Sequence, residues 1–335
     1  MNIKDIASLT GLSVATVSRV INNQSSVTKE TREKVEKVIK ETGYTPNFLG
    51  RNLRVSKTQK ILVIIPTISN LFYSEILEAI QDASTNSGFN ILIGITNNDP
   101  ELENKYMELL TTKQVDGAIL FLSQFDKELM TAWSKKFPIV QCCEYTRGSD
   151  VTNVSIDNKQ GAYDAVSYLI SRGHTKIGAI RGQLYFASEA DRTDGYMQAL
   201  SDNRIERDLK YSYVTEYTME GGKKGAEALM RLENPPTAIF AYGDTIAIGV
   251  IKTLKDMKKI VMNRKDGKRN VAVIGFDDIP LCTLFTPTIS TVEQPKYQLG
   301  ITAFNLLMEK MNNPDMENKS VVLPHRLIIR QSSEF

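Results

Sequence analysis

The sequence lacks the segments that mark membrane and secreted proteins. Its 335 residues contain no uninterrupted apolar run of about 18 residues, the length that a membrane-spanning helix needs. Lys4 and Asp5 stand where the apolar part of a secretory signal would begin. We therefore expect a cytoplasmic protein with no membrane partner.

Residues that bind metals or form disulfide frameworks are scarce. The chain has three cysteines and two histidines, which are Cys142, Cys143, Cys282, His174 and His325. Adjacent cysteines rarely bridge, so a reducing compartment fits better than a disulfide-stapled fold. None of these residues has zinc-like spacing. We expect no metal site and no cofactor.

Common catalytic motifs are also missing. The sequence contains no Gly-x-Ser-x-Gly, no P-loop and no Gly-x-Gly-x-x-Gly. The alternative from the enzyme class is a hydrolase in which Asp244 and Asp277 form an acid/base pair. Turnover of a bound ligand would distinguish it. We expect a protein that is not an enzyme and has no catalytic residues.

Charge is small overall and unevenly distributed. The whole chain has a formal net charge of +2. Residues 1–60 contain 11 Lys/Arg and 5 Asp/Glu, a balance of +6, whereas residues 61–335 contain 30 and 34, a balance of −4. A basic head on an acidic body favours binding of a polyanion at one end. The alternative is a solvated helix in which Lys and Glu alternate.

The basic head has the pattern of a helix-turn-helix. Apolar residues recur at helical spacing from Ile3 to Leu9, and Gly11 suits the tight turn that follows. Ser13 is a good N-cap for a second helix. The inward face of that helix is expected to be Val17, Val20 and Ile21.

The outward face of the second helix suits a DNA major groove. Val14, Ala15 and Thr16 are small enough to let the helix sit deep in the groove, where the first two offer methyl contact to thymine. Arg19 can reach the O6 and N7 atoms of guanine. A third helix is predicted over 28–43, from a capping threonine to a terminating glycine.

The stretch 2–54 resembles the lactose-repressor (LacI/GalR) family of bacterial transcription regulators. The resemblance rests on Ala15-Thr16-Val17-Ser18-Arg19-Val20-Ile21-Asn22 and on Tyr44-x-Pro46-Asn47 followed by Leu53. It implies a homodimer that a small molecule releases from, or recruits to, a palindromic double-stranded DNA operator. The expected DNA contacts are Ser13, Val14, Ala15, Thr16, Ser18, Arg19, Asn22, Asn47, Leu53 and Arg54.

A short hinge is expected after the head, at 46–58. Pro46 prevents the third helix from continuing, and Asn47 can cap a short new one. In the family, two such helices pair across the dimer, and the leucine matching Leu53 wedges into the minor groove. The alternative is an ordinary linker whose leucine packs on protein. Gly50 departs from the family's usual alanine, which should make the helix harder to form without DNA.

After the hinge, the sequence alternates between strands and helices. Runs of Val, Ile and Leu such as 61–66 and 90–95 are typical of buried parallel strands, and a helical segment follows each. A second series is predicted to begin at 154–156. Two such series imply two doubly wound α/β lobes, with a ligand cleft at the carboxyl ends of their strands.

This body resembles the effector domain of the same family, itself similar to periplasmic sugar-binding proteins. Matching phrases include Asn70-Leu-Phe-Tyr-Ser-Glu-Ile76, Arg172-Gly-His-Thr-Lys-Ile177 and Gly275-Phe-Asp-Asp278. The implied organisation is an all-α helix-turn-helix headpiece (1–45), the hinge (46–58) and an α/β effector and dimerisation domain (59–335). Lobe 1 is expected at about 59–160 and 291–322, and lobe 2 at about 161–290 and 323–335.

Residues that directly follow a strand are candidates to line the cleft. Asp277 matches the family's ligand-binding aspartate, and Arg192 matches an arginine that holds ligand oxygens. For each candidate, the alternative is a solvated loop residue or a helix cap. The residues expected to bind the ligand are Phe72, Tyr73, Ser123, Glu144, Asp157, Phe186, Ser188, Arg192, Tyr217, Asp244 and Asp277.

The effector is expected to be a sugar or sugar derivative, or else a nucleoside. Aromatic residues such as Phe72 and Tyr217 would stack equally well on a nucleobase or on the apolar face of a sugar. Glu144 beside Tyr145, with the run 294–297, looks closer to the cytidine-repressor branch of the family than to its galactoside-responsive members. A protein co-regulator becomes the better hypothesis if no small molecule binds.

Two further features bear on assembly and function. The stretch 262–270 has no counterpart in the family, and it is predicted to be an exposed basic loop or simply a tolerated insertion. No heptad tail follows Pro324, which favours a dimer over a tetramer.

We expect an effector-controlled, sequence-specific regulator, most simply a repressor. The alternative is a non-regulatory sugar- or nucleoside-binding protein, or a hydrolase, on the same two-lobed fold.

Overall fold

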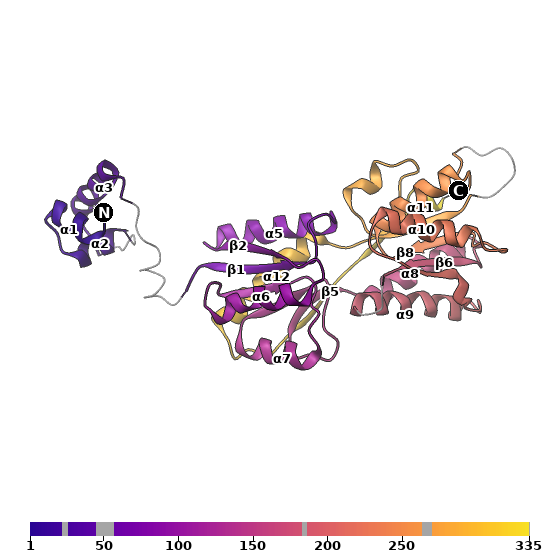
Figure 1. Ribbon diagram of the computed structural model, residues 1–335, viewed down its shortest axis with the longest axis horizontal. Coiled ribbons are helices and arrows are strands. Elements are labelled where there is room, and N and C mark those ends of the chain that lie inside the picture. The colour runs from indigo at the N-terminus through magenta and orange to yellow at the C-terminus, as the bar shows by residue number, and fades with distance from the viewer. Residues whose placement is uncertain (22–25, 45–56, 183–185, 263–269, 335) are drawn as a thin grey trace. The chain divides into compact units, whose positions relative to one another are not determined.

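In the computed structural model the chain divides into two compact units, Met1–Thr58 and Gln59–Phe335 (Figure 1). The structure describes residues 1–21, 26–44, 57–182, 186–262 and 270–334. The predicted hinge contacts and most of the 262–270 stretch lie outside these residues. Where that stretch rejoins the described chain, Asn270 is buried and its side chain bonds both the N–H and the carbonyl of Val261, at 2.9 and 3.1 Å.

The head consists of α1 (Ile3–Thr10), α2 (Val14–Ile21) and α3 (Lys29–Thr42). Its helices begin and end where the sequence indicates. Gly11, at φ 66°, supplies the left-handed turn after α1. Thr28 caps α3 by accepting from the N–H of Thr31. Fully buried Ile6, Val17 and Val35, one from each helix, form the centre of its core.

The first lobe is built on an all-parallel sheet with helices on both faces. Its strands lie in the order β11-β5-β4-β3-β1-β2. They are β1 (Lys60–Ile65), β2 (Asn90–Ile95), β3 (Gly117–Leu120), β4 (Ile139–Cys142), β5 (Thr152–Ile156) and β11 (Ser320–Leu323). Its helices are α5 (Phe72–Asn86), α6 (Pro100–Thr111), α7 (Lys127–Lys136) and α12 (Lys296–Asn312).

Strand β1 shows why these runs are apolar throughout. Ile61, Val63 and Ile65 pack on the side of α5 and α12, whereas Leu62 and Ile64 pack on the side of α6 and α7. Successive side chains of a strand point to opposite faces, so a strand covered on both faces needs apolar residues at every position.

The second lobe repeats the plan with one reversed edge strand. The order is β12-β10-β9-β8-β6-β7, in which β12 is antiparallel to β10 and the other neighbours are parallel. The strands are β6 (Ile177–Arg181), β7 (Ser212–Val214), β8 (Ala238–Ala241), β9 (Ala272–Asp277), β10 (Ser290–Glu293) and β12 (Arg326–Ile328). The helices are α8 (Asn158–Ser171), α9 (Ala187–Asp202), α10 (Met219–Met230) and α11 (Asp244–Asp256). The predicted fold class, with two doubly wound lobes, is confirmed.

One detail of the prediction is wrong. The strand at 154–156 does not open the second series, because β5 pairs with β4 and β11 in the first sheet, on the lobe 1 side of the expected crossing near residue 160. Strand β10 pairs with β9 in the second sheet, so the chain returns to lobe 1 after Glu293, close to the expected position of about 290. Strand runs of similar composition fit either sheet, so their local pattern could not assign them.

Candidate DNA-binding and effector sites

Helix α2 exposes side chains that are predicted to contact DNA bases and buries its apolar side chains. Val17 and Val20 are buried, whereas Val14 is 41% exposed and Ala15 and Arg19 are also exposed. Helix amphipathicity is the cause, because the buried stripe leaves the opposite face in solvent.

Two of the predicted DNA contacts also start the helix. The N–H of Thr16 donates to Ser13 Oγ at 3.1 Å, and the two hydroxyls lie 2.9 Å apart. Thr16 and Ser18 are half-buried. Four other predicted DNA contacts, Asn22, Asn47, Leu53 and Arg54, lie outside the described residues.

The body contains a cavity of about 560 Å³ lined by both lobes, here called the inter-lobe cavity. Carboxyl ends of parallel strands from the two sheets meet there, as doubly wound folds require. Eight residues predicted from sequence line it: Phe72, Tyr73, Glu144, Phe186, Ser188, Arg192, Tyr217 and Asp277.

Arg192 on α9 lines the second-lobe side of the cavity and contacts several elements there. It is buried, and its Nε donates to Asn158 Oδ1 at 2.9 Å while Nη1 donates to the carbonyl of Tyr242. Its guanidinium carbon lies 3.7 Å from the centroid of the Phe276 ring, and Nη2 lies 3.9 Å from Asp277 Oδ1. Arg192 thus joins α8, α9 and the ends of β8 and β9 beside the cavity.

Asp277 ends β9 in a backbone conformation that is rare for a residue with a side chain, at φ 117°. Its Oδ1 accepts from Gln294 Nε2 at 2.8 Å, and Lys296 Nζ donates to its backbone carbonyl at 3.0 Å. Burial raises the pKa of the Asp277 carboxyl, while Arg192, Gln294 and Lys296 lower it.

Glu144 and Ser188, both predicted to bind ligand, bind each other across the lobes. Ser188 donates its Oγ to Glu144 Oε2 at 2.5 Å and its N–H to Oε1 at 3.0 Å. Beside them, Asp191 accepts from the Tyr145 hydroxyl at 2.6 Å and pairs with Arg147. These contacts, here called the inter-lobe latch, connect the loop after β4 in lobe 1 to α9 in lobe 2.

Aromatic rings form the lobe 1 side of the cavity. Tyr73 packs edge-on against Phe121 with centroids 5.5 Å apart, and Phe72 packs against Tyr73 at 5.3 Å. Phe186 and Tyr217 face the cavity from lobe 2. Rings on both sides suit a ligand with a flat or apolar face.

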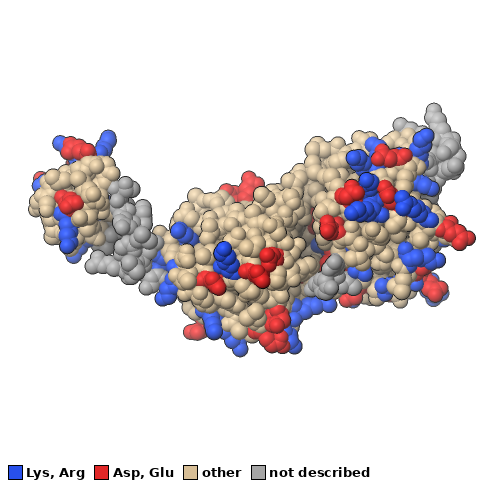
Figure 2. All heavy atoms as spheres, viewed as in Figure 1, with Lys and Arg blue, Asp and Glu red and all other residues tan. Residues whose placement is uncertain are grey.

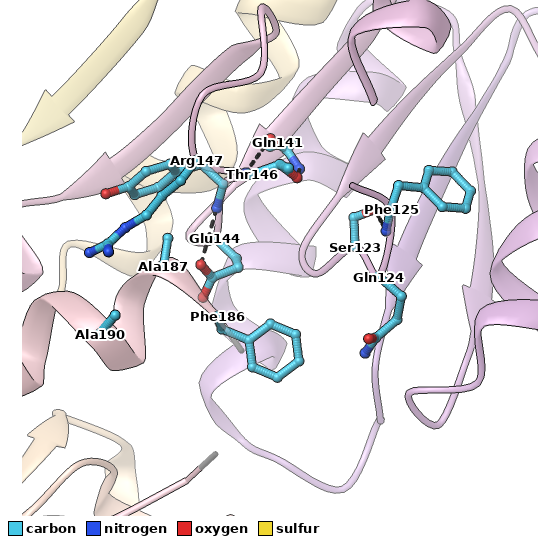
Figure 3. Close-up of a pocket in the computed structure, with 11 residues that line it drawn as sticks. Ser123, Gln124, Phe125, Gln141, Glu144, Thr146, Arg147, Phe186, Ala187 and Ala190 are labelled. Carbon is cyan, nitrogen blue, oxygen red and sulfur yellow. Dashed lines mark hydrogen bonds between the residues drawn. The ribbon is translucent and has the colours of Figure 1, made fainter. Parts of the chain in front are cut away.

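Three predicted ligand residues lie elsewhere. Ser123 lines a separate cavity of about 340 Å³, which it borders opposite Glu144 and Phe186 (Figure 3). Asp157 is a helix cap that accepts from the N–H of Gln160 at 2.8 Å. Asp244 is fully buried, where its Oδ1 accepts from Thr291 Oγ1 at 2.7 Å and its Oδ2 from the N–H of Ile279 at 2.9 Å. Asp157 and Asp244 accept structural hydrogen bonds at a helix start and after a strand, and the sequence pattern alone did not separate that role from ligand binding.

The structure adds cavity residues that were not predicted to bind ligand. Asn70, Gln294 and Cys143 belong to stretches already singled out in the sequence, but nothing local indicated that their side chains line the cavity. Glu189, in the first turn of α9, gave no signal at all. Acidic residues are common in first turns of solvated helices.

Both signs of charge are mixed over the face of the 59–335 unit shown in Figure 2. Within the described ranges, no helix combines the length and apolar character needed to cross a membrane. Among the same residues, no group of three His, Cys, Asp or Glu side chains is placed to hold a metal ion.

A helix-turn-helix head and a two-lobed body with an inter-lobe cavity define the class of DNA-binding regulators with a periplasmic-binding-protein-like body. Residues 2–47 match the family model of bacterial regulatory proteins of the lacI family, and residues 58–331 match that of periplasmic binding proteins and the sugar-binding domain of the LacI family. The chain belongs to the LacI family of transcriptional regulators, whose members bind DNA and are not enzymes.

Individual relatives span nearly the whole chain. The transcriptional repressor CytR of Escherichia coli K12 is 34% identical over 331 residues, which cover 98% of this chain and 95% of CytR. A LacI-family regulator from Enterococcus faecium, solved with bound ribose, is 26% identical with a TM-score of 0.71, covering 82% of this chain and 98% of that one. The lac repressor dimer bound to operator and the anti-inducer ONPF shares the fold at a TM-score of 0.87 and 22% identity, with 99% of each chain covered.

Proposed function

We propose that this protein is a homodimeric repressor that binds a palindromic operator and changes its operator affinity when a small neutral or cationic ligand enters the inter-lobe cavity. The observation that carries the proposal is the meeting of Arg192, Asp277 and aromatic rings from both lobes around one cavity in a chain with a helix-turn-helix head. The cytoplasm, where the operator DNA lies, is the expected site of action.

The effector is a sugar, a sugar derivative or a nucleoside. A volume of about 560 Å³ suits a ligand of one or two rings. Rings such as Tyr73 and Tyr217 can stack on it, and carboxylates such as Asp277 can accept from its hydroxyls. The relative from Enterococcus faecium that holds ribose supports a sugar.

The inter-lobe latch suggests how a ligand could be sensed. Glu144–Ser188 and Arg147–Asp191 already join the lobes beside the cavity, so a ligand that adds contacts on both sides shifts the balance between open and closed arrangements. Coupling of this kind is typically about 1–3 kcal/mol, or roughly 5–150-fold in operator affinity.

Dimerisation places two copies of α2 on successive major grooves, about 10 base pairs apart. The proposed dimer surface includes exposed apolar residues of lobe 1, Leu92 and Ile93 on β2 and Ile68 and Leu71 before α5. A dimer is expected from size-exclusion chromatography with light scattering.

The test has two stages. A thermal-shift screen of sugars, sugar phosphates, amino sugars and nucleosides finds ligands, because a ligand at about 100 times its dissociation constant adds about 2.7 kcal/mol. Each hit is then added to a fluorescent operator duplex bound by the protein, and anisotropy reports release or recruitment. A hit that binds without changing operator affinity contradicts the proposal, as does a hit that is turned over. Arg19→Ala is the matched control, since it should keep the thermal shift and lose operator specificity.

A further inference from the structure

Glu189 on α9 is a buried carboxyl for which the described residues provide no hydrogen-bond partner. It is 1% exposed, lines the inter-lobe cavity, and neither Oε1 nor Oε2 is bonded within the described part of the chain. Glu103, buried at 2% exposure, provides the contrast. It accepts from Ser123 Oγ at 2.5 Å and from the N–H of Gln124 at 2.8 Å. A buried acceptor with no partner is costly, and it marks a position where a ligand can supply one.

The charged groups around Glu189 are bonded to other residues. Arg192 is bonded to Asn158 and to the Tyr242 carbonyl. Arg181 donates to Ser212 Oγ and to the Gly182 carbonyl, each at 3.1 Å.

Burial raises the pKa of Glu189 to about 7. Arg192, the Gly182 N–H, which approaches the carboxyl without completing a hydrogen bond, and Arg181 lower it, and the nearby Glu144 raises it further. The site therefore favours an additional positive charge near this carboxyl.

The charged side chains that line the cavity also favour a positively charged ligand. Among the described residues that line it, the acidic ones are Glu144, Glu189, Glu216 and Asp277, and the basic one is Arg192. Arg192 already faces Asp277 at 3.9 Å. A phosphate or carboxylate on the ligand would meet this acidic surplus, whereas a protonated amine would reduce it.

We propose that Glu189 is a subsite for a protonated amine, so that the effector is an amino sugar or an aminonucleoside. The inference rests on the proposed function and specifies its ligand class. A carboxylate offers acceptors only, and an ammonium offers donors together with the opposite charge. A hydroxyl supplies a donor but no charge, so the amine should be preferred over the matching hydroxyl by about 10-fold or more, the value of one charge-assisted hydrogen bond.

The direct test measures binding of matched pairs by calorimetry to the full-length protein and to Glu189→Gln. The pairs are glucosamine with glucose, galactosamine with galactose, and 3′-amino-3′-deoxyadenosine with adenosine. We expect at least one amine to bind about 10-fold or more tightly than its hydroxyl partner, and the preference to fall below about 3-fold in Glu189→Gln. Equal binding within every pair, no binding of any amine, or a preference that survives in Glu189→Gln overturns the proposal.

A second measurement needs no ligand. Glu189→Gln should raise the melting temperature of the free protein at pH 8 by about 2 °C or more, because it removes a buried charge without removing a hydrogen bond. Glu103→Gln, the matched control, should lower it, because Glu103 is bonded to Ser123 and Gln124. A fall for Glu189→Gln would mean that Glu189 has a structural partner, which overturns the proposal.

Operator anisotropy separates this inference from the function on which it rests. If only uncharged ligands bind and they release the operator, the regulator function stands and the amine subsite is wrong. If an amine binds through Glu189 but leaves operator affinity unchanged, the subsite stands and effector control is wrong.

Discussion

Replacing Arg192 by Ala should destabilise the body more than any other single change at the cavity wall. The side chain is buried and joins four elements through Asn158, the Tyr242 carbonyl, the Phe276 ring and Asp277. Its removal leaves Asn158 Oδ1 and the Tyr242 carbonyl without the donor that Arg192 supplies. It also leaves the Asp277 carboxyl without its nearest opposite charge.

The expected magnitude follows from these contacts. Breaking a buried ion pair by removing one partner costs about 3–5 kcal/mol, because the remaining charge stays buried and uncompensated. For a unit of this size about 2 °C corresponds to each kcal/mol, so the melting temperature should fall by roughly 6–10 °C. Arg192→Lys keeps the charge but cannot span the separate acceptors with one ammonium, so a loss of about 1–3 kcal/mol is expected.

Thermal melts followed by circular dichroism provide the assay, and Asp277→Asn provides the second arm of a double-mutant cycle. Asn keeps an oxygen that can accept from Gln294 Nε2, which now lies 2.8 Å from Asp277 Oδ1. If the ion pair carries the effect, Arg192→Ala should cost at least about 1 kcal/mol less in the Asp277→Asn background. A melting temperature within about 2 °C of wild type for Arg192→Ala, or the same loss in both backgrounds, would refute the reasoning.

Three further predictions concern separate parts of the chain. Arg19→Ala should remove about 1–3 kcal/mol of discrimination at one guanine, measured by competition with single-base operator variants. The control Lys34→Ala on α3 should leave the base preference intact. Unchanged selectivity in Arg19→Ala would contradict the assignment of Arg19 to a guanine. The pKa of Glu189 is raised from 4.5 to about 7, so its contribution to stability is present below about pH 4.5 and is lost as the pH rises through about 7. Ligand-free melts should therefore show a fall in stability between pH 5 and pH 8 that is smaller in Glu189→Gln, and an equal fall in both proteins would count against it. Gly249→Ala should lower the melting temperature by roughly 2–6 °C, because the added Cβ would lie 2.0 Å from the Met219 carbonyl between α11 and α10; no change would show that the two helices pack less closely.

The sequence determined the secondary structure of the head because the signals there are local. Helix-period apolar residues, the caps at Ser13 and Thr28 and the glycine at 11 each act within a few residues of the bond they form. The outward placement of Arg19 follows from the same periodicity. The two-lobed α/β class was predictable for a similar reason, since strands covered on both faces require continuous apolar runs.

Only the tertiary structure decided which strands belong to each lobe and which side chains line the cavity. The strands at 152–156 and 290–293 carry no mark of their sheet, and hydrogen bonding to β4 and β9 assigns them. Arg192 and Asp277 were expected at the cleft and lie there, whereas Asp244, which also follows a strand, accepts hydrogen bonds inside a buried network.

Glu189 is a cavity residue that the sequence could not predict. In sequence it resembles any acid in the first turn of a solvated helix, and only the tertiary structure buries it beside a cavity without a partner among the described residues. Local patterns specify which face of an element is apolar, but burial and pairing of a polar side chain depend on elements far away in the chain. The physical reason is that desolvation and hydrogen bonding are set by three-dimensional neighbours, which the sequence specifies only through the complete fold.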